Sequence, residues 1–226
     1  MIYAMSDIHG CYEKYRQMLD LIRFGEEDTL YILGDVVDRG PDGIRTLLDM
    51  MGRKNIVPLR GNHEVIAMSL LKKLTEPLIR HNRKLVELIE LWQQDGGKTT
   101  CQGFLMLDQE ARDKVLNYMN RFLIYEELTV NSRKFFLSHT IPEKEKMLDF
   151  DSCRCEDFVM GKPEYDKQYF ADSYLITGHT LTGLIESSSL GKIWRSHHHI
   201  AIDCGAVFGN PLGCICLDTM EEFYVD

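Results

Sequence analysis

The most constraining feature of this sequence is a short apolar run that ends in glycine and a cluster of charged side chains. Residues 30–33 form the apolar run, which predicts a buried strand. Gly34 follows at once, and Asp35, Asp38 and Arg39 come next. Strand ends in α/β proteins leave side chains at the rim of a sheet, where ligands bind. The stretch therefore predicts a functional site, although an acidic turn with a local Asp–Arg pair is the competing interpretation.

The same pattern occurs twice more in the first third of the chain. The apolar run 2–6 leads to Asp7 and His9, and a second run leads to Asn62 and His63. Each of these alone also fits a surface turn or a core histidine. Three such strand ends in succession argue against coincidence.

Amphipathic stretches separate these runs and predict helices with one apolar face. The expected elements are strands at 2–6, 29–33 and 56–59, and helices at 12–23, 41–51, 65–94 and 109–121. Residues 92–100 contain two glycines and are expected to form a loop. The alternation of strands and helices indicates an α/β fold.

The second half of the chain is rich in predicted strands, and two of them end in histidine. Residues 123–130 and 134–138 predict a hairpin that leads to His139, and residues 174–177 lead to Gly178 and His179. Further strands are expected at 199–205 and within 212–225, whereas 143–170 reads as polar and irregular.

Together, five strand ends deliver six side chains of mixed oxygen and nitrogen type, a set that suits divalent transition metals. These candidate ligands are Asp7, His9, Asp35, Asn62, His139 and His179. Two ions that share Asp35 would use all six. Such a pair lowers the pKa of a bound water from 15.7 to about 7 and neutralises phosphoryl oxygens.

Composition narrows the possible partners. The 226 residues carry a formal net charge of −9, which argues against nucleic acid as the partner because no basic excess is present. No apolar run reaches the ~18 residues of a membrane span, and we expect neither a membrane partner nor a signal peptide. The seven cysteines are scattered along the sequence, and we expect them to be reduced thiols. We therefore expect a cytoplasmic protein.

Three motifs carry a resemblance to a known family. Residues 6–10 (Ser-Asp-Ile-His-Gly), 34–40 (Gly-Asp-Val-Val-Asp-Arg-Gly) and 60–64 (Arg-Gly-Asn-His-Glu) resemble the signatures of calcineurin-like metallophosphoesterases. They are most similar to the phosphoprotein phosphatase branch, which also contains symmetrical diadenosine tetraphosphatases. The resemblance implies a single domain over residues 1–226. It also implies a two-sheet β-sandwich flanked by helices in four αββα layers, with two metal ions, usually Mn²⁺ and alternatively iron or zinc.

The resemblance also implies a role for each motif residue. Asp7, His9 and Asp35 would hold one metal, and Asp35, Asn62, His139 and His179 the other. His63 would be the general acid, oriented by Asp38, and Arg39 would bind phosphate.

Two positions depart from the family pattern. The family usually follows its third-strand histidine with Ala-Gly, whereas Thr140 and Ile141 follow His139 here. Lys162 occupies the place of a second phosphate-binding arginine, which keeps the charge and loses the bidentate fork. Arg154 is the alternative residue for this role.

The resemblance implies a hydrolase that attacks phosphomonoesters with a metal-bridging hydroxide. Our first hypothesis is a serine/threonine-type protein phosphatase that acts on phosphorylated proteins. The alternative is a dinucleoside polyphosphate (diadenosine tetraphosphate) hydrolase, which acts on a small nucleotide. A metal-binding protein that has lost catalysis is the third possibility.

Overall fold

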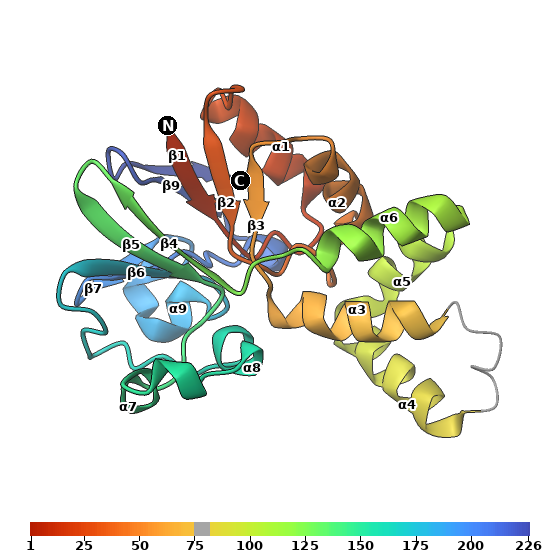
Figure 1. Ribbon diagram of the computed structural model, residues 1–226. Coiled ribbons are helices and arrows are strands. Elements are labelled where there is room, and N and C mark those ends of the chain that lie inside the picture. Colours follow the sequence, from red (N-terminus) through yellow and green to blue (C-terminus); the bar gives the residue numbers. More distant parts are fainter. Residues whose placement is uncertain (75–81) are drawn as a thin grey trace.

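Two five-stranded mixed sheets pack face to face, and helices cover their outer faces in the computed structural model (Figure 1). The structure describes residues 1–74 and 82–226. The strand order is β10-β9-β1-β2-β3 in the first sheet and β4-β5-β6-β8-β7 in the second. The predicted α/β class with two sheets flanked by helices is confirmed.

The strands of the first sheet are β1 (Ile2–Met5), β2 (Thr29–Ile32), β3 (Ile56–Pro58), β9 (Leu212–Cys216) and β10 (Glu222–Val225). Those of the second sheet are β4 (Tyr125–Val130), β5 (Arg133–Ser138), β6 (Ser173–Thr177), β7 (Trp194–Ser196) and β8 (His199–Ala201). Strand β7 lay outside the predicted elements.

The helices before β4 are α1 (Tyr12–Leu21), α2 (Gly43–Met51), α3 (Asn62–Leu74), α4 (Arg83–Trp92), α5 (Lys98–Leu105) and α6 (Gln109–Met119). Those after β5 are α7 (Lys144–Met147), α8 (Cys155–Val159) and α9 (Thr182–Ile185). Short 3-10 turns occur at Phe150–Ser152, Ser187–Ser189 and Ala206–Phe208.

The pairing of the strands explains why polar groups gather at one edge. Strands β1, β2 and β3 are mutually parallel, and so are β5, β6 and β8. The carboxyl ends of parallel strands meet at the same edge of a sheet. The loops that follow these ends therefore carry the predicted site residues to one place.

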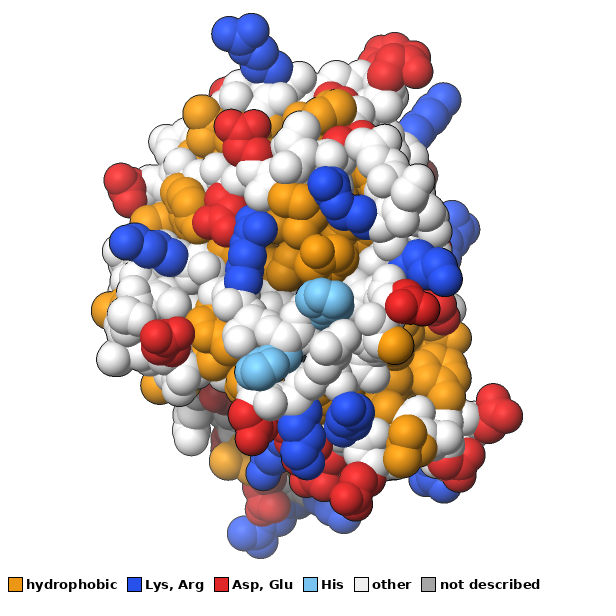
Figure 2. Space-filling view, turned by 90° about the vertical axis from the view of Figure 1, so that its left-hand side faces the viewer, with side chains coloured by type: hydrophobic (Ala, Val, Ile, Leu, Met, Phe, Trp, Pro, Cys, Tyr) orange, Lys and Arg blue, Asp and Glu red, His pale blue; other side chains and the backbone are white. Residues whose placement is uncertain are grey.

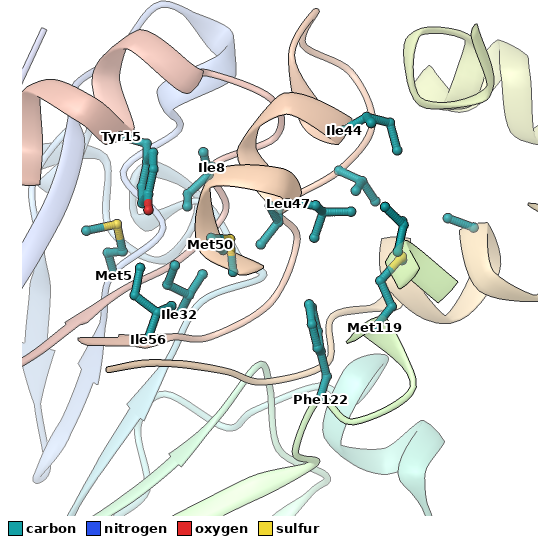
Figure 3. Packing of buried hydrophobic residues seen from close by; sticks show 14 of the residues in the cluster. Met5, Ile8, Tyr15, Ile32, Ile44, Leu47, Met50, Ile56, Met119 and Phe122 are labelled. Atoms are coloured by element: carbon teal, nitrogen blue, oxygen red, sulfur yellow. The ribbon is translucent and has the colours of Figure 1, made fainter. Parts of the chain in front are cut away.

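The first sheet is covered by an apolar cluster to which helices α1 to α6 all contribute (Figure 3). Helix α2 buries Ile44, Leu47 and Met50 against the sheet, while Leu48 is 41% exposed. The spacing of the three buried residues follows the helical period.

Two further clusters complete the layers. Between the sheets lie side chains such as Leu33, Leu137 and Ile215. On the far face of the second sheet, Phe136 and Leu175 pack with Phe158 of α8. The order of layers is thus helices, sheet, sheet and helices, as expected.

Three expectations about local structure were wrong or incomplete. The helix expected at 65–94 begins at Asn62, and it is described as α3 and α4, with residues 75–81 outside the described part of the chain. The break expected at 92–100 is shorter than predicted: α4 ends at Trp92, α5 begins at Lys98, and the chain is kinked between them at Gly96, which has a non-helical φ of +107°. The expected irregular segment 143–170 contains α7 and α8, and Phe158 of α8 packs on the second sheet together with Phe150 and Phe170.

The face opposite α3–α6 carries charges of both signs. Figure 2 shows Lys and Arg side chains interspersed there with Asp and Glu. The exposed His197 and His198 form the turn between β7 and β8. The described residues on this face form no continuous basic surface of the kind that binds a nucleic-acid backbone. Among the described residues, no helix combines the length and apolarity needed to cross a membrane.

Candidate metal centre

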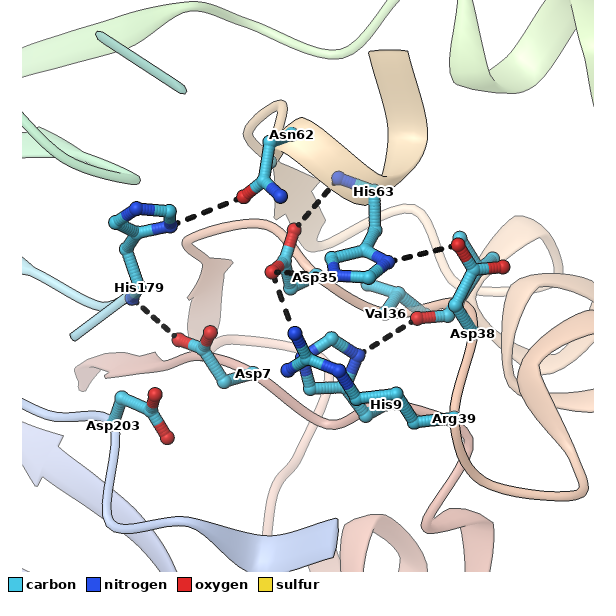
Figure 4. Close-up of polar contacts among 12 residues, drawn as sticks. Asp7, His9, Asp35, Val36, Asp38, Arg39, Asn62, His63, His179 and Asp203 are labelled. Carbon is cyan, nitrogen blue, oxygen red and sulfur yellow. Dashed lines mark hydrogen bonds and ion pairs between the residues drawn. The ribbon is translucent and has the colours of Figure 1, made fainter. Parts of the chain in front are cut away.

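Asp35, directly after β2, lies at the centre of the site (Figure 4). Its side chain is buried, and Oδ1 accepts a hydrogen bond of 3.1 Å from the His63 backbone N–H. Oδ1 also lies 3.5 Å from His139 Nε2, and Oδ2 lies 3.5 Å from His9 Nε2. The two oxygens therefore face groups from different strands.

Two groups of potential ligands share this carboxylate. One comprises His9, Asp35 and His63, and the other comprises Asp35, His139 and His179; within each group the ligand atoms lie within 4.8 Å of one another. This arrangement is consistent with the expected dinuclear metal site. Which metals it holds remains a prediction.

The second group has the donor chemistry of a cation site. Asn62 Oδ1 lies 3.0 Å from both His139 Nε2 and His179 Nδ1, and the two nitrogens are 3.1 Å apart. His139 Nδ1 donates to the Leu33 carbonyl at 2.7 Å, so its Nε2 carries a lone pair. Metal–nitrogen distances of ~2.0–2.1 Å place neighbouring ligand atoms roughly 2.9–3.4 Å apart. The three converging acceptors therefore fit a bound cation.

The ring nitrogens of these histidines are prepared for metal binding in the same way. His9 Nδ1 donates to the Val37 carbonyl at 2.9 Å, which leaves Nε2 directed at Asp35. Burial lowers the pKa of His9 and of His179 to about 4, and it also lowers the pKa of His139. Neutral imidazole is the form that ligates a metal.

Three buried carboxyl groups, those of Asp7, Asp35 and Asp203, lie in the same region. Burial and the charges of Asp203 and Asp35 raise the pKa of Asp7, and burial raises the pKa of Asp203 to about 7. Burial opposes ionisation of Asp35 as well, but the neighbouring histidines outweigh it and lower its pKa to about 2. Within the described residues, the ion pairs of these carboxylates are those of Asp35 with histidines. Buried charge of this kind requires compensation, which divalent cations would supply.

Asp7 lies beside the centre but in neither tight group. Its Oδ2 accepts the His179 backbone N–H at 3.0 Å, which ties β1 to the loop after β6. This approach requires glycine at 178, because a Cβ there would lie 2.2 Å from Asp7 Oδ2. Asp203, after β8, lies on the other side of Asp7 (Figure 4). The sequence-based list missed Asp203, although it follows a strand end as the listed residues do.

His63 differs from the other histidines in its partner. Its Nδ1 donates to Asp38 Oδ2 at 2.8 Å, and its buried Nε2 has no hydrogen-bond partner among the described residues and lies 3.9 Å from Asp35 Oδ2. Burial alone lowers the pKa of His63, but the Asp38 hydrogen bond and the Asp35 charge outweigh it and raise the pKa. A protonated His63 would direct an N–H at the centre.

Arg39 lies at the mouth of the site. Its side chain is exposed, and Nη1 donates to His9 Nε2 at 2.7 Å. The guanidinium also lies 5.5 Å from the centroid of the Phe208 ring. The group is therefore placed between the metal ligands and solvent.

The two candidates for a second phosphate-binding residue are both exposed. Lys162 follows Gly161, whose carbonyl accepts a hydrogen bond of 3.2 Å from Thr140 Oγ1 beside His139. Arg154 precedes α8, and its backbone N–H donates to Asp157 at 2.8 Å. The Lys162 segment thus runs along the loop that carries His139.

The site loops adopt a conformation that side-chain-bearing residues rarely take. Left-handed φ angles between 44° and 68° occur at Asp7, His9, Asp35, Asp38, Arg39 and His179. Such residues cost about 1–3 kcal/mol each and persist where surrounding structure holds them. Hydrogen bonds between loops, such as His9 N–H to the Asp35 carbonyl at 2.8 Å, hold them here.

Glu64 is a second residue that the sequence-based list missed. Its fully buried carboxylate accepts the backbone N–H groups of Asp35, Val36, Val37 and Gly61 at 2.7–3.2 Å. Burial raises its pKa to about 7. The carboxylate fixes the loop that presents Asp35, and only its position within the 60–64 motif could have drawn attention to it.

The fold and these two ligand groups define the class of a metallophosphoesterase hydrolase. Residues 1–183 match the family of calcineurin-like phosphoesterases, and the chain belongs to this family. Among named relatives, the symmetrical bis(5'-nucleosyl)-tetraphosphatase of Wigglesworthia glossinidia brevipalpis is 39% identical over 38% of this chain and 32% of its own length. The aligned stretch thus spans about a third of that relative.

Other comparisons extend over the whole chain. The symmetrical bis(5'-nucleosyl)-tetraphosphatase of Neisseria gonorrhoeae is 26% identical over 97% of this chain and 93% of its own length. A solved structure provisionally assigned as a diadenosine tetraphosphatase aligns with a TM-score of 0.69 and 18% identity, covering 99% of this chain and 92% of its own. A serine/threonine phosphatase from Saccharomyces cerevisiae aligns with a TM-score of 0.61 and 13% identity, covering 100% and 80%. At these identities the structural matches establish the fold.

Proposed function

We propose that this protein hydrolyses dinucleoside polyphosphates of the diadenosine tetraphosphate type at a dinuclear metal site. The observation that carries phosphoester hydrolysis is the pair of ligand groups sharing Asp35, with His63 and Arg39 beside them. The substrate is proposed from the names of the relatives. They favour the nucleotide alternative over the protein phosphatase, which was our first hypothesis from the sequence.

The metals, when bound, would lower the pKa of water and neutralise phosphoryl oxygens. Asp7, His9 and Asp35 would hold one ion, and Asp35, Asn62, His139 and His179 the other. His63 is in addition within reach of the first group, since its Nε2 lies 3.9 Å from Asp35 Oδ2. Its hydrogen bond to Asp38 favours proton transfer over ligation.

The remaining side chains would bind substrate and move a proton. Arg39 would donate to a phosphoryl oxygen in place of its present bond to His9. The His63 Nε2 proton would pass to the leaving oxygen as its bond to phosphorus breaks. Asp38 would stay ionised and hold the His63 ring. Lys162 would contribute a second cation for the phosphate chain.

One aromatic residue supports a nucleotide substrate. Phe208 is 58% exposed and lies next to the Arg39 guanidinium, so its ring is available at the mouth of the site. In contrast, Phe150, Phe158 and Phe170 of the 143–170 segment pack in a cluster on the second sheet. Base stacking on an aromatic side chain contributes about 1–3 kcal/mol.

The proposal is tested by substrate preference. The protein is stripped of metal and reloaded with Mn²⁺, and hydrolysis of diadenosine tetraphosphate, a phosphoserine peptide and an aryl phosphate is compared. We expect the dinucleotide to give the highest kcat/KM and two molecules of nucleoside diphosphate as products. Phe208→Leu should raise the KM for the dinucleotide by ~5–150-fold and leave the KM for the phosphopeptide unchanged.

Other outcomes would redirect the assignment. A higher kcat/KM for the phosphopeptide would support our first hypothesis, the protein phosphatase. Absence of hydrolysis with two metals bound would favour a metal-binding protein that has lost catalysis. Lys162, which stands in place of an arginine, would then be the first residue to test as the cause.

A further inference from the structure

The kinked turn between α4 and α5 contacts three consecutive residues of the site. Arg39 N–H donates to the Gly96 carbonyl at 2.9 Å, and Thr99 Oγ1 donates to the Gly40 carbonyl at 2.7 Å. Asp38 N–H donates to Thr100 Oγ1 at 2.8 Å. We call residues 92–100 the brace. It holds the backbone that carries Asp38 and Arg39.

Trp92 connects the brace to the proton-transfer pair. Its indole Nε1–H donates to Asp38 Oδ2 at 2.8 Å, the same oxygen that accepts the His63 Nδ1–H at 2.8 Å. Trp92 is 4% exposed and Asp38 is fully buried. The other carboxylate oxygen, Oδ1, is buried and has no partner within residues 1–74 and 82–226. The two N–H groups therefore supply all the side-chain hydrogen bonds that Asp38 receives from the described residues.

The glycines of the brace make this contact possible. A Cβ on Gly97 would lie 2.2 Å from the Trp92 indole ring, and Gly96 has a φ of +107° with Arg39 Cγ 2.8 Å from a built Cβ. Any side chain at either position would displace Trp92 or Arg39. The pair of glycines is thus explained by close packing around the site, without a phosphate-binding role.

We propose that Trp92 is a positioning residue for proton transfer by His63 and acts through Asp38. The indole N–H fixes the carboxylate in the orientation that aligns the His63 ring, so that Nε2 faces the leaving oxygen. This inference rests on the proposed function, in which His63 is the general acid. It differs from a packing role, because a packing residue has no reason to affect one leaving group more than another.

The experiment compares phenyl phosphate, which has a poor leaving group, with 4-nitrophenyl phosphate, which has a good one. Protonation of the leaving oxygen matters most for the poor leaving group. Trp92→Phe keeps the aromatic bulk and removes the N–H. We expect it to lower kcat on phenyl phosphate by ~10–100-fold and kcat on 4-nitrophenyl phosphate much less. Ile89→Val, at another buried position of α4, is the matched control and should leave the ratio of the two rates unchanged.

His63→Ala, measured in parallel, separates two kinds of failure. If His63→Ala changes the ratio and Trp92→Phe does not, Trp92 only packs and the inference is overturned. If His63→Ala leaves the ratio unchanged, His63 is not the acid, and both the proposed role of His63 and the inference are overturned.

A measurement on the unmutated tryptophan covers the case in which Trp92→Phe does not fold. The chain has two tryptophans, and the other, Trp194, donates to Glu186 at 3.2 Å. Asp38→Asn should shift the proton resonance of the Trp92 indole N–H and leave that of Trp194 in place. An unmoved Trp92 resonance would show that the hydrogen bond to Asp38 is absent.

Discussion

His139 and His63 face the same carboxylate, Asp35, and differ in the partner of their other ring nitrogen. His139 Nδ1 donates to a backbone carbonyl at 2.7 Å, whereas His63 Nδ1 donates to the Asp38 carboxylate at 2.8 Å. A carbonyl fixes the tautomer without adding charge, so burial prevails and lowers the pKa of His139. The carboxylate outweighs burial and raises the pKa of His63.

The different partners suit the histidines to two different functions. A neutral ring whose second nitrogen is held by a carbonyl is a metal ligand. A ring held by a buried carboxylate retains its proton and can donate it. The partner, which lies elsewhere in the sequence, decides between them.

Removal of the shared carboxylate should have the largest effect, because it disturbs both sides of the comparison. We expect Asp35→Asn to lower turnover by more than the ~10²–10⁴-fold typical of losing a general acid. Bound metal should fall below two ions per chain. Elemental analysis of the reloaded protein, together with turnover, measures both. Two ions and near-normal turnover would contradict the central position of Asp35.

Asp38→Asn should give the His63 ring an uncharged hydrogen-bond partner, like the partner of His139. The amide holds the ring without charge, so turnover should fall by ~10–100-fold, as for other outer partners. Metal content should not change, because Asp38 lies outside both ligand groups. Loss of metal from this variant would mean that Asp38 and His63 contribute to metal binding.

Glu64→Gln should affect stability more than chemistry. Its carboxylate accepts four backbone N–H groups around Asp35, and a single amide oxygen cannot replace it. We expect a loss of about 1–3 kcal/mol in the free energy of unfolding by urea. Glu87→Gln, which removes an exposed pair with Arg83, is the control and should change stability by less than about 0.5 kcal/mol. Equal effects would contradict the role of Glu64.

A histidine outside the site extends the comparison to pH. His199 is buried, its Nε2 is 2.8 Å from Thr177 Oγ1, and burial lowers its pKa to about 3. The unfolded chain takes up this proton near pH 6.5 and the folded chain does not, so stability is present above pH 6.5 and is lost as pH falls. The slope is at most about 1.4 kcal/mol per pH unit. Urea unfolding at pH 7.5 and 5.5 should show a smaller difference in His199→Gln; an equal difference would contradict this assignment.

Much of the fold was predictable from sequence because each strand of the parallel sets ends in a short polar motif. Asp35, His139 and His179 could be expected to lie close together because each follows the end of a predicted strand. The two adjacent glycines of the brace predicted the break in the helix, but not its hydrogen bonds to residues 38–40, because those tertiary partners are distant in the sequence. Glu64 and Trp92 were missed for a similar reason. Their roles depend on hydrogen bonds to residues 27–54 positions away, which no local pattern records.

The most direct test of the two functions is the metal content of His63→Ala after reloading with Mn²⁺. If His63 moves a proton and His9, His139 and His179 bind metal, the variant retains two ions per chain while its turnover falls by roughly 10²–10⁴-fold. If it retains fewer than two ions, His63 is itself a ligand, as its place in the first group allows. The distinction between the histidines drawn from their ring partners would then be wrong.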